Sequence, residues 1–162
     1  MKKLATLFIL LITLTSATIY KSSNEETQKI KYLIQLNPYE GEGAYIVVSL
    51  MNPEGEYEKT LFVQGDDPEW YFDIESWWSF YGKKRRKLDG ITGATIKGGQ
   101  RAVNMIEVDK ELMNKGYSIQ FESIVEDMPY YIKDVLVPLT DEGLATKHEG
   151  TGYIKYVRLS VQ

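Results

Sequence analysis

The sequence predicts a mainly β fold, an antiparallel Ig-like β-sandwich of about seven strands with one short helix. Apolar and polar residues alternate with a period of two from Lys29 onward, which is the pattern of strands that bury one face. Turn-forming residues separate these segments, as in the run Asn-Pro-Glu-Gly at 52–55. The chain also contains 12 Tyr, 3 Trp and 5 Phe, and aromatic residues favour strands.

Seven segments carry the strand pattern, and the second and third of them form a hairpin around the turn at 52–55. One segment differs, because the apolar positions of 70–80 fit neither the strand nor the helix period. We expect its second half to be the short helix, packed on the sandwich. The predicted strands are 29–36, 44–50, 56–64, 100–108, 117–126, 130–137 and 152–161.

The N-terminus has the features of an export signal. Lys2 and Lys3 precede an apolar run at 4–14, and small residues follow at 15–17. The run is shorter than the roughly 20 residues that span a bilayer. The sequence therefore favours a cleaved signal peptide, with an uncleaved membrane anchor that extends to Tyr20 as the alternative.

The length of 162 residues is enough for one domain with a real core. We divide the chain into a signal peptide at 1–17, a polar linker at 18–28 and a sandwich domain at 29–162. The domain is expected to work in the periplasm or elsewhere outside the cytoplasm.

Composition excludes several kinds of site. The chain has no Cys, so it has no disulfide, thiolate metal site or attached c-type haem. His148 is the only His, which excludes a site with several His ligands. The net charge of -4 argues against general nucleic-acid binding.

The segment 89–95 reads D-G-I-T-G-A-T and fits the pattern D-x-x-[ST]-G-A-T. This pattern resembles the acceptor motif of proteins flavinylated by ApbE-type FMN transferases. The flavin subunits of sodium-translocating NADH:quinone oxidoreductase and of the Rnf complexes share that motif. The resemblance implies that the hydroxyl of Thr95 is joined to the FMN phosphate as a phosphoester. The cofactor-binding residues that it implies are Asp89, Gly90, Thr92, Gly93, Ala94 and Thr95.

The surrounding chain resembles a family of periplasmic domains of unknown function. The likeness rests on G-x-Y-x-x-T-L at 55–61, a Trp pair at 77–78 and a Gly pair at 98–99, and it covers about residues 30–135. Members of that family are often encoded beside PepSY-type membrane reductases and flavin transferases. The resemblance therefore implies two partners, an ApbE-type transferase and a PepSY-like membrane reductase.

The residue types of the motif suit an acceptor. A Thr hydroxyl is a weak nucleophile, so the transferase must supply a base and a metal. Gly90 and Gly93 let the backbone enter another protein's cleft, and Ala94 removes bulk beside the acceptor. Asp89 is expected either to coordinate the transferase's metal or to hold the loop by an Asx turn.

Three features near the motif have alternative interpretations. Backbone N–H groups of Gly98 and Gly99 are expected to hold the phosphate. Trp77 and Trp78 are candidates to stack on the flavin, although neighbouring side chains point to different sides, so one of them should be core. The basic run 83–87 either stabilises the reduced flavin, steers an acidic partner, or is a solvated loop.

The sequence thus predicts an electron carrier that relays electrons from a membrane reductase through covalent FMN. The alternative is an exported Ig-like binding module without a redox cofactor. A self-contained hydrolase is disfavoured, because no nucleophile with its base is recognisable. Trp70 is expected in the core and His148 in an exposed loop.

Overall fold

The computed structural model describes residues 26–84 and 92–162, and the side chains of 83–84 are not among those described. Several predictions fall outside these ranges and stay predictions. They concern the signal peptide, most of the linker, the basic run 83–87, Asp89 and Gly90.

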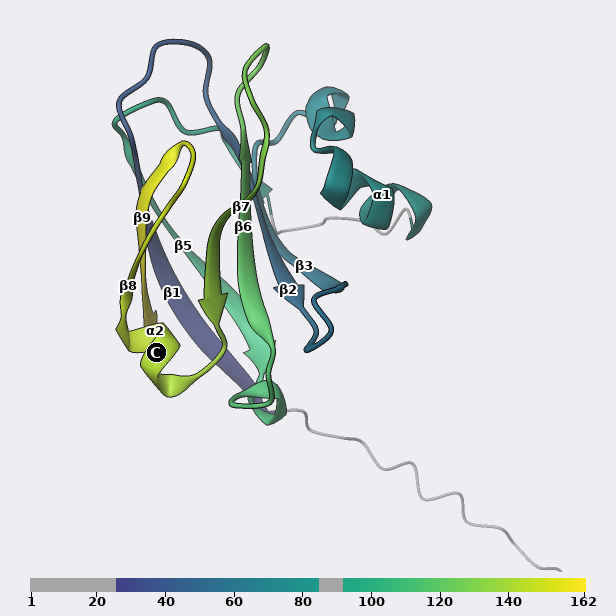
Figure 1. Cartoon of the computed structure of the whole chain (residues 1–162), viewed down its shortest axis with the longest axis vertical. Helices are drawn as coiled ribbons and strands as arrows, with labels where there is room; N and C mark the ends of the chain where they lie inside the picture. Colours follow the sequence, from purple (N-terminus) through teal and green to yellow (C-terminus); the bar gives the residue numbers. More distant parts are fainter. Residues whose placement is uncertain (1–25, 85–91) are drawn as a thin grey trace, which may run out of the picture.

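The described residues form two sheets that face each other (Figure 1), which confirms the mainly β sandwich. The first sheet has the order β5-β1-β9-β8 and the second β4-β3-β2-β6-β7. The strands are β1 (Thr27–Leu36), β2 (Tyr45–Met51), β3 (Tyr57–Gln64), β4 (Thr92–Gly93), β5 (Arg101–Asp109), β6 (Ser118–Ile124), β7 (Tyr131–Pro138), β8 (Lys147–Glu149) and β9 (Ile154–Val161). The helices are η1 (Pro68–Asp73), α1 (Glu75–Lys84), η2 (Lys110–Leu112) and α2 (Asp141–Ala145).

The seven long strands correspond to the seven predicted segments, with ends that shift by a few residues. The short strands β4 and β8 were not predicted, because two or three residues carry no periodic pattern. β4 pairs with β3 in parallel, whereas the other strand pairs are antiparallel. The likeness to immunoglobulin domains extends to the two-sheet architecture and not to the strand order, because β1 and β2 lie in opposite sheets.

The core lies between the two sheets. Alternate residues of β1, namely Ile30, Tyr32 and Ile34, point inward and are fully buried. The Tyr32 ring meets the ring of Phe121 from β6 edge to face, with 5.6 Å between the centroids. Such pairs stabilise a core beyond the area they bury.

A third layer covers the outer face of the second sheet. There η1 and α1 lie beside the second sheet (Figure 1), and Tyr71, Ile74 and Trp77 pack against Val47 and Val63. This layer explains why β2 is an almost continuous apolar run, since both of its faces are buried. It also positions α1, which is the short helix that the sequence predicted.

Asp134 of β7 connects the second sheet to the turn that leads into β9. Its carboxylate is 1% exposed and accepts hydrogen bonds from three backbone N–H groups, those of Thr151, Gly152 and Ile154. Ser123 also donates its hydroxyl to Asp134. One buried carboxylate thus accepts the backbone hydrogen bonds of the turn that leads into β9.

Replacing this carboxylate should destabilise the fold. In Asp134→Ala the N–H groups of Gly152 and Ile154 lose their acceptor, whereas that of Thr151 keeps the main-chain carbonyl of residue 134, and we expect a loss of about 3 kcal/mol in the free energy of unfolding. Urea titration followed by circular dichroism measures it. Asp109→Ala is the matched control, because Asp109 makes no capping hydrogen bond to η2, and its effect should stay within about 0.5 kcal/mol. Equal effects of the two variants would refute this role of Asp134.

Candidate functional site

The C-terminal half of the motif is attached to the second sheet on both sides of Thr95. Before it, Thr92 and Gly93 pair in parallel with the end of β3. After it, Ile96 pairs with Ala44, with N···O distances of 2.7 and 3.2 Å. Gly93 was expected to let the backbone enter another protein's cleft, and the structure shows that backbone pairing attaches residues 92–96 to the second sheet in the free protein.

The Thr95 side chain lies against a glycine. A Cβ atom added to Gly43 would lie 2.3 Å from Thr95 Oγ1, so only glycine leaves room for this hydroxyl. Gly43 directly precedes Ala44, whose pairing with Ile96 brings the two segments together. The environment of the Thr95 hydroxyl is thus set by main chain, and the side chain is half-buried.

Thr95 lines a cleft with a volume of about 630 Å³. This is within the usual range of small-molecule sites, about 300–1,000 Å³. The walls come from the segment before β2, from η1 and the start of α1, and from the turn between β6 and β7. The lining residues are Glu42, Gly43, Tyr45, Trp70, Phe72, Asp73, Glu75, Thr95, Ile124, Val125, Glu126, Asp127, Met128 and Tyr130.

Aromatic side chains form much of this cleft. Tyr45, Trp70, Phe72 and Tyr130 all line it, and Phe72 is 54% exposed although it is large and apolar. Tyr45 is held by the ring of Tyr71, 6.4 Å away and nearly perpendicular. Planar apolar walls of this kind suit a flat ring system.

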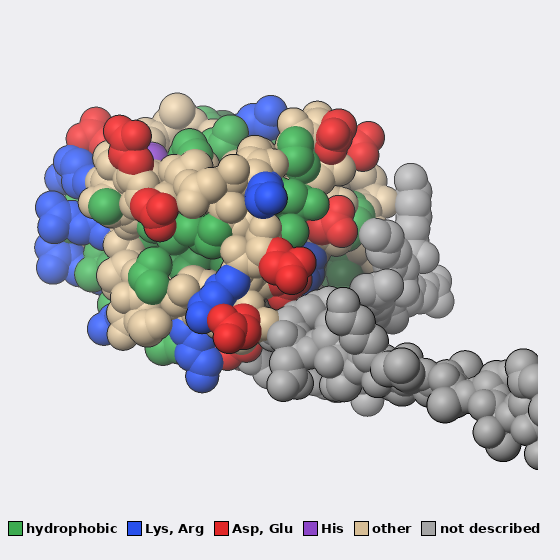
Figure 2. Space-filling view, turned by 90° about the horizontal axis from the view of Figure 1, so that it is seen from below, with side chains coloured by type: hydrophobic (Ala, Val, Ile, Leu, Met, Phe, Trp, Pro, Cys, Tyr) green, Lys and Arg blue, Asp and Glu red, His purple; other side chains and the backbone are tan. Residues whose placement is uncertain are grey.

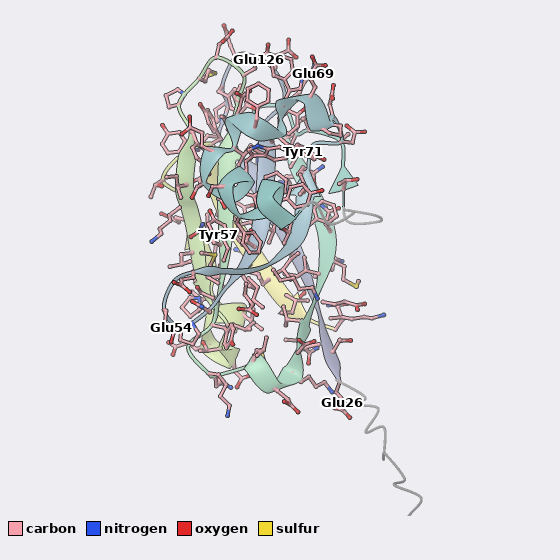
Figure 3. The ribbon with its side chains drawn as sticks, turned by 90° about the vertical axis from the view of Figure 1, so that its right-hand side faces the viewer. Glu26, Glu54, Tyr57, Glu69, Tyr71 and Glu126 are labelled. Carbon is pink, nitrogen blue, oxygen red and sulfur yellow. The ribbon has the colours of Figure 1, made fainter. Side chains whose placement is uncertain are left out.

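Carboxylates are the second component of the cleft lining. They come from Glu42, Asp73, Glu75, Glu126 and Asp127. Figure 3 labels Glu126 at the upper end of the molecule, the end at which Glu69 is also labelled. Burial, together with the nearby groups Asp67, Tyr71, Asp66 and Glu126, raises the pKa of the Tyr45 hydroxyl to about 12. The described lining therefore gives the cleft a negative electrostatic potential.

The described lining fits FMN in part. The volume and the aromatic walls suit the isoalloxazine ring, and Thr95 places an acceptor hydroxyl at the wall. The carboxylates oppose a phosphate, and no Lys or Arg lines the described cleft. The basic run 83–87, which the sequence offered as a partner for negative charge, lies outside the described side chains.

The three Trp residues are placed differently from the prediction. Trp77 is fully buried, with its Nε1 donating to Thr60 Oγ1 at 2.8 Å, so the expectation that one of the pair is core is confirmed. Trp78 is 37% exposed and does not line the cleft. Trp70 was expected in the core, but it is only partly buried and lines the cleft. Because η1 is a short 3-10 helix, its sequence gave no period from which this orientation follows.

The glycine pair has a structural role that was not predicted. Gly99 has φ +76°, which favours glycine, and its N–H donates to Asn37 O at 2.9 Å. A Cβ on Gly98 would lie 2.4 Å from Tyr39 O. The prediction that both N–H groups hold a phosphate is therefore wrong for Gly99, whose N–H is already used in a turn.

Glu122 is a buried acid next to the cleft that the sequence analysis missed. It is 0% exposed on the outer face of β6, and it accepts hydrogen bonds from the hydroxyls of Tyr57, at 2.5 Å, and of the cleft residue Tyr130. Gln120 Nε2 lies 3.4 Å from it. Burial raises the pKa of the Glu122 carboxyl, against the opposing effect of these hydrogen bonds. In the sequence Glu122 looks like an ordinary outward-facing strand residue, because nothing in the pattern of this strand indicates that the helical layer will cover it.

The remaining candidates are simpler. His148 is half-buried in β8 rather than in an exposed loop, with Nε2 2.7 Å from Gly143 O. Among the described residues, no three His, Cys, Asp or Glu side chains are grouped to hold a metal. No described helix is long and apolar enough to span a membrane.

Comparison with known proteins gives one match. The model of a family described as "Predicted periplasmic protein (DUF2271)" matches residues 27–156. No curated protein and no solved structure matches the chain.

The buried acid should make stability depend on pH. The folded protein raises the pKa of the Glu122 carboxyl, so folding favours its protonated form. The resulting stabilisation of the fold is complete below the unfolded pKa of about 4.3, and it is lost as the pH rises through the folded pKa. Glu122→Gln, which cannot ionise, should therefore gain stability relative to the natural protein as pH rises from 4 to 8. Melting temperatures across that range measure the difference. Glu111→Gln, in exposed η2, is the control and should run parallel to the natural protein, whereas a Glu122→Gln curve that also ran parallel would contradict the assignment.

Proposed function

Because the chain belongs to the DUF2271 family of predicted periplasmic proteins, we propose that it works outside the cytoplasm as a carrier of FMN covalently attached to Thr95. The observation that carries the proposal is the position of Thr95. The residue that the sequence motif names as the acceptor lines the aromatic cleft. The sequence motif and the cleft are independent features of the chain, and they meet at one hydroxyl.

The proposal assigns each part of the site a task. FMN, when bound, supplies one- and two-electron transfer. Trp70, Phe72 and Tyr130 offer flat surfaces for its ring, and the pairings of β4 and Ile96 hold the point of attachment. Covalent attachment keeps the cofactor on a protein that works where free FMN would diffuse away.

The partners follow from the same proposal. An ApbE-type flavin transferase attaches the FMN, and a membrane reductase of the PepSY type supplies electrons. The carboxylates around the cleft favour a donor or acceptor whose docking surface is positive. They also disfavour negative charge on the reduced ring, which lowers its reduction potential.

A second candidate function uses the cleft without redox chemistry. Aromatic walls with five carboxylates also suit a cationic ligand, through cation–π contacts and ion pairs. An exported binding module of this kind would not need the hydroxyl of Thr95. Substitution of that hydroxyl therefore separates the two candidates.

Removing the acceptor hydroxyl tests the proposal. The protein co-expressed with an ApbE-type transferase should be yellow after denaturation, and the peptide that contains Thr95 should gain the mass of one FMN moiety. Thr95→Ala should abolish the gain, and Thr92→Ala, the matched control within the motif, should only reduce it. Unmodified protein made with a transferase that is active on another substrate would refute the proposal.

Gly43 tests whether the observed geometry matters for attachment. A methyl group at this position would overlap Thr95 Oγ1, so Gly43→Ala should lower the yield of flavinylated protein at least severalfold while the chain still folds. The yield is read by absorbance and mass. Gly55→Ala is the control for a destabilising glycine substitution outside the motif, because its φ of +82° favours glycine while a Cβ there meets nothing within 4 Å, and it should leave attachment intact. Undiminished flavinylation of Gly43→Ala would show that the acceptor leaves this position when it reacts.

A further inference from the structure

The outward face of the first sheet is uncovered. On β1 the residues with odd numbers point away from the core, and the register places Lys31 beside Met105 and Ser160. The next row brings Leu33 between Val103 and Arg158. The helices lie elsewhere, because η1 and α1 cover the second sheet and α2 places Leu144 in the sandwich core. We call this outward surface of β5, β1, β9 and β8 the open face.

Positive charge is concentrated on the open face of an acidic protein. Figure 2 shows Lys and Arg gathered along the left edge, the side on which β8 and β9 lie in Figure 1. The cations at outward register positions are Lys29, Lys31, Arg101, Lys147 and Arg158. The carboxylates at such positions are Glu107, Asp109 and Glu149, so the face has an excess of two positive charges. The whole chain, by contrast, has a net charge of -4.

The ion pairs on the open face involve only some of its cations, so the others can interact with a partner. Glu107 pairs with Lys29 at 3.7 Å and Glu149 with Lys147 at 2.9 Å. Among the described residues, Lys31, Arg101 and Arg158 have no carboxylate within the 4.0 Å of an ion pair. Their charge is therefore directed at solvent or at a partner.

Apolar side chains lie among these cations. Val103 is 50% and Met105 49% exposed, and half-buried Leu33 lies beside them. Tyr156 adds an amphipathic ring that both Lys147 and Arg158 approach, with centroid distances of 5.5 and 5.9 Å. A sheet face that mixes long cations with exposed apolar side chains matches the headgroup region of an anionic bilayer, where cations meet phosphates and apolar groups enter the interface.

We propose that the open face is a docking surface for a membrane that contains anionic lipids. A membrane surface is favoured over an acidic protein because the exposed apolar side chains lie among the cations, and a bilayer interface offers phosphates and apolar groups together. The position of β1 supports the same occupant, since β1 belongs to the open face and begins at Thr27, directly after the N-terminal segment that carries the apolar run 4–14. Whether that segment is cleaved or remains as an anchor, docking brings the domain to the bilayer. The cleft belongs to the second sheet and its helical layer, so it stays open to other proteins.

Vesicle binding tests the proposal. The exported protein, purified from the extracytoplasmic fraction, should co-sediment with vesicles of phosphatidylglycerol and phosphatidylcholine, and more weakly with phosphatidylcholine alone. Salt at about 0.5 M should remove this difference between the two kinds of vesicle, because the screening length shortens from about 10 Å at 0.1 M salt toward about 3 Å at 1 M. Each charge removed should weaken binding about fivefold, so Lys31→Gln with Arg158→Gln should weaken it about 30-fold.

Matched controls separate this surface from general attraction. Lys133→Gln with Lys115→Gln removes the same charge from exposed positions on β7 and before β6, and should leave vesicle binding within about twofold. Binding that is equal for both kinds of vesicle, or lowered equally by both pairs of substitutions, would overturn the proposal. The proposal would also be overturned if sedimentation analysis showed a dimer that the double variant no longer forms, since the open face would then be an interface with a second copy of the chain. None of these outcomes depends on flavin, which a mass spectrum of the same sample reports separately.

Discussion

Backbone pairing on both sides of Thr95 is the constraint on which the site depends. The parallel pairing of β4 with β3 fixes the chain before Thr95, and the pairing of Ile96 with Ala44 fixes it after. Gly43 can then lie directly against the hydroxyl, because the same pairing brings residues 43–44 alongside the motif. Without these hydrogen bonds the motif would be a loop of undefined position, and the acceptor would have no fixed relation to the cleft.

The helical layer provides the other half of the site. It converts the outer face of the second sheet into a second small core around Trp77, and the same segment turns Trp70 and Phe72 toward the cleft. Beneath it, the acid Glu122 is shut away from water while its partner Tyr130 lines the cleft. Burial of an acid usually costs stability, so its retention between two phenols is more easily understood as a property of the cleft than of the core.

The sequence predicted the strands well and the site unevenly. Period-two alternation is a local signal, so the seven long strands and the turn at 52–55 could be found without a structure. The roles of Gly98 and Gly99 could not, because what surrounds them comes from residues 37–39, far away in the chain. Glu122 and Trp70 were missed for a related reason, since both acquire their environment from the layer formed by η1 and α1. The motif named Thr95, but only the fold shows that Gly43 and an aromatic cleft surround it.

We infer that the motif and the cleft form one cofactor site. The most direct measurement is an experimental structure of the flavinylated protein. We expect electron density continuous from Thr95 Oγ1 through a phosphate to a ring that lies in the cleft against Trp70, Phe72 or Tyr130. Density for a ring that leaves Thr95 and extends into solvent, with the cleft unchanged and empty, would contradict the claim even if the attachment itself were correct.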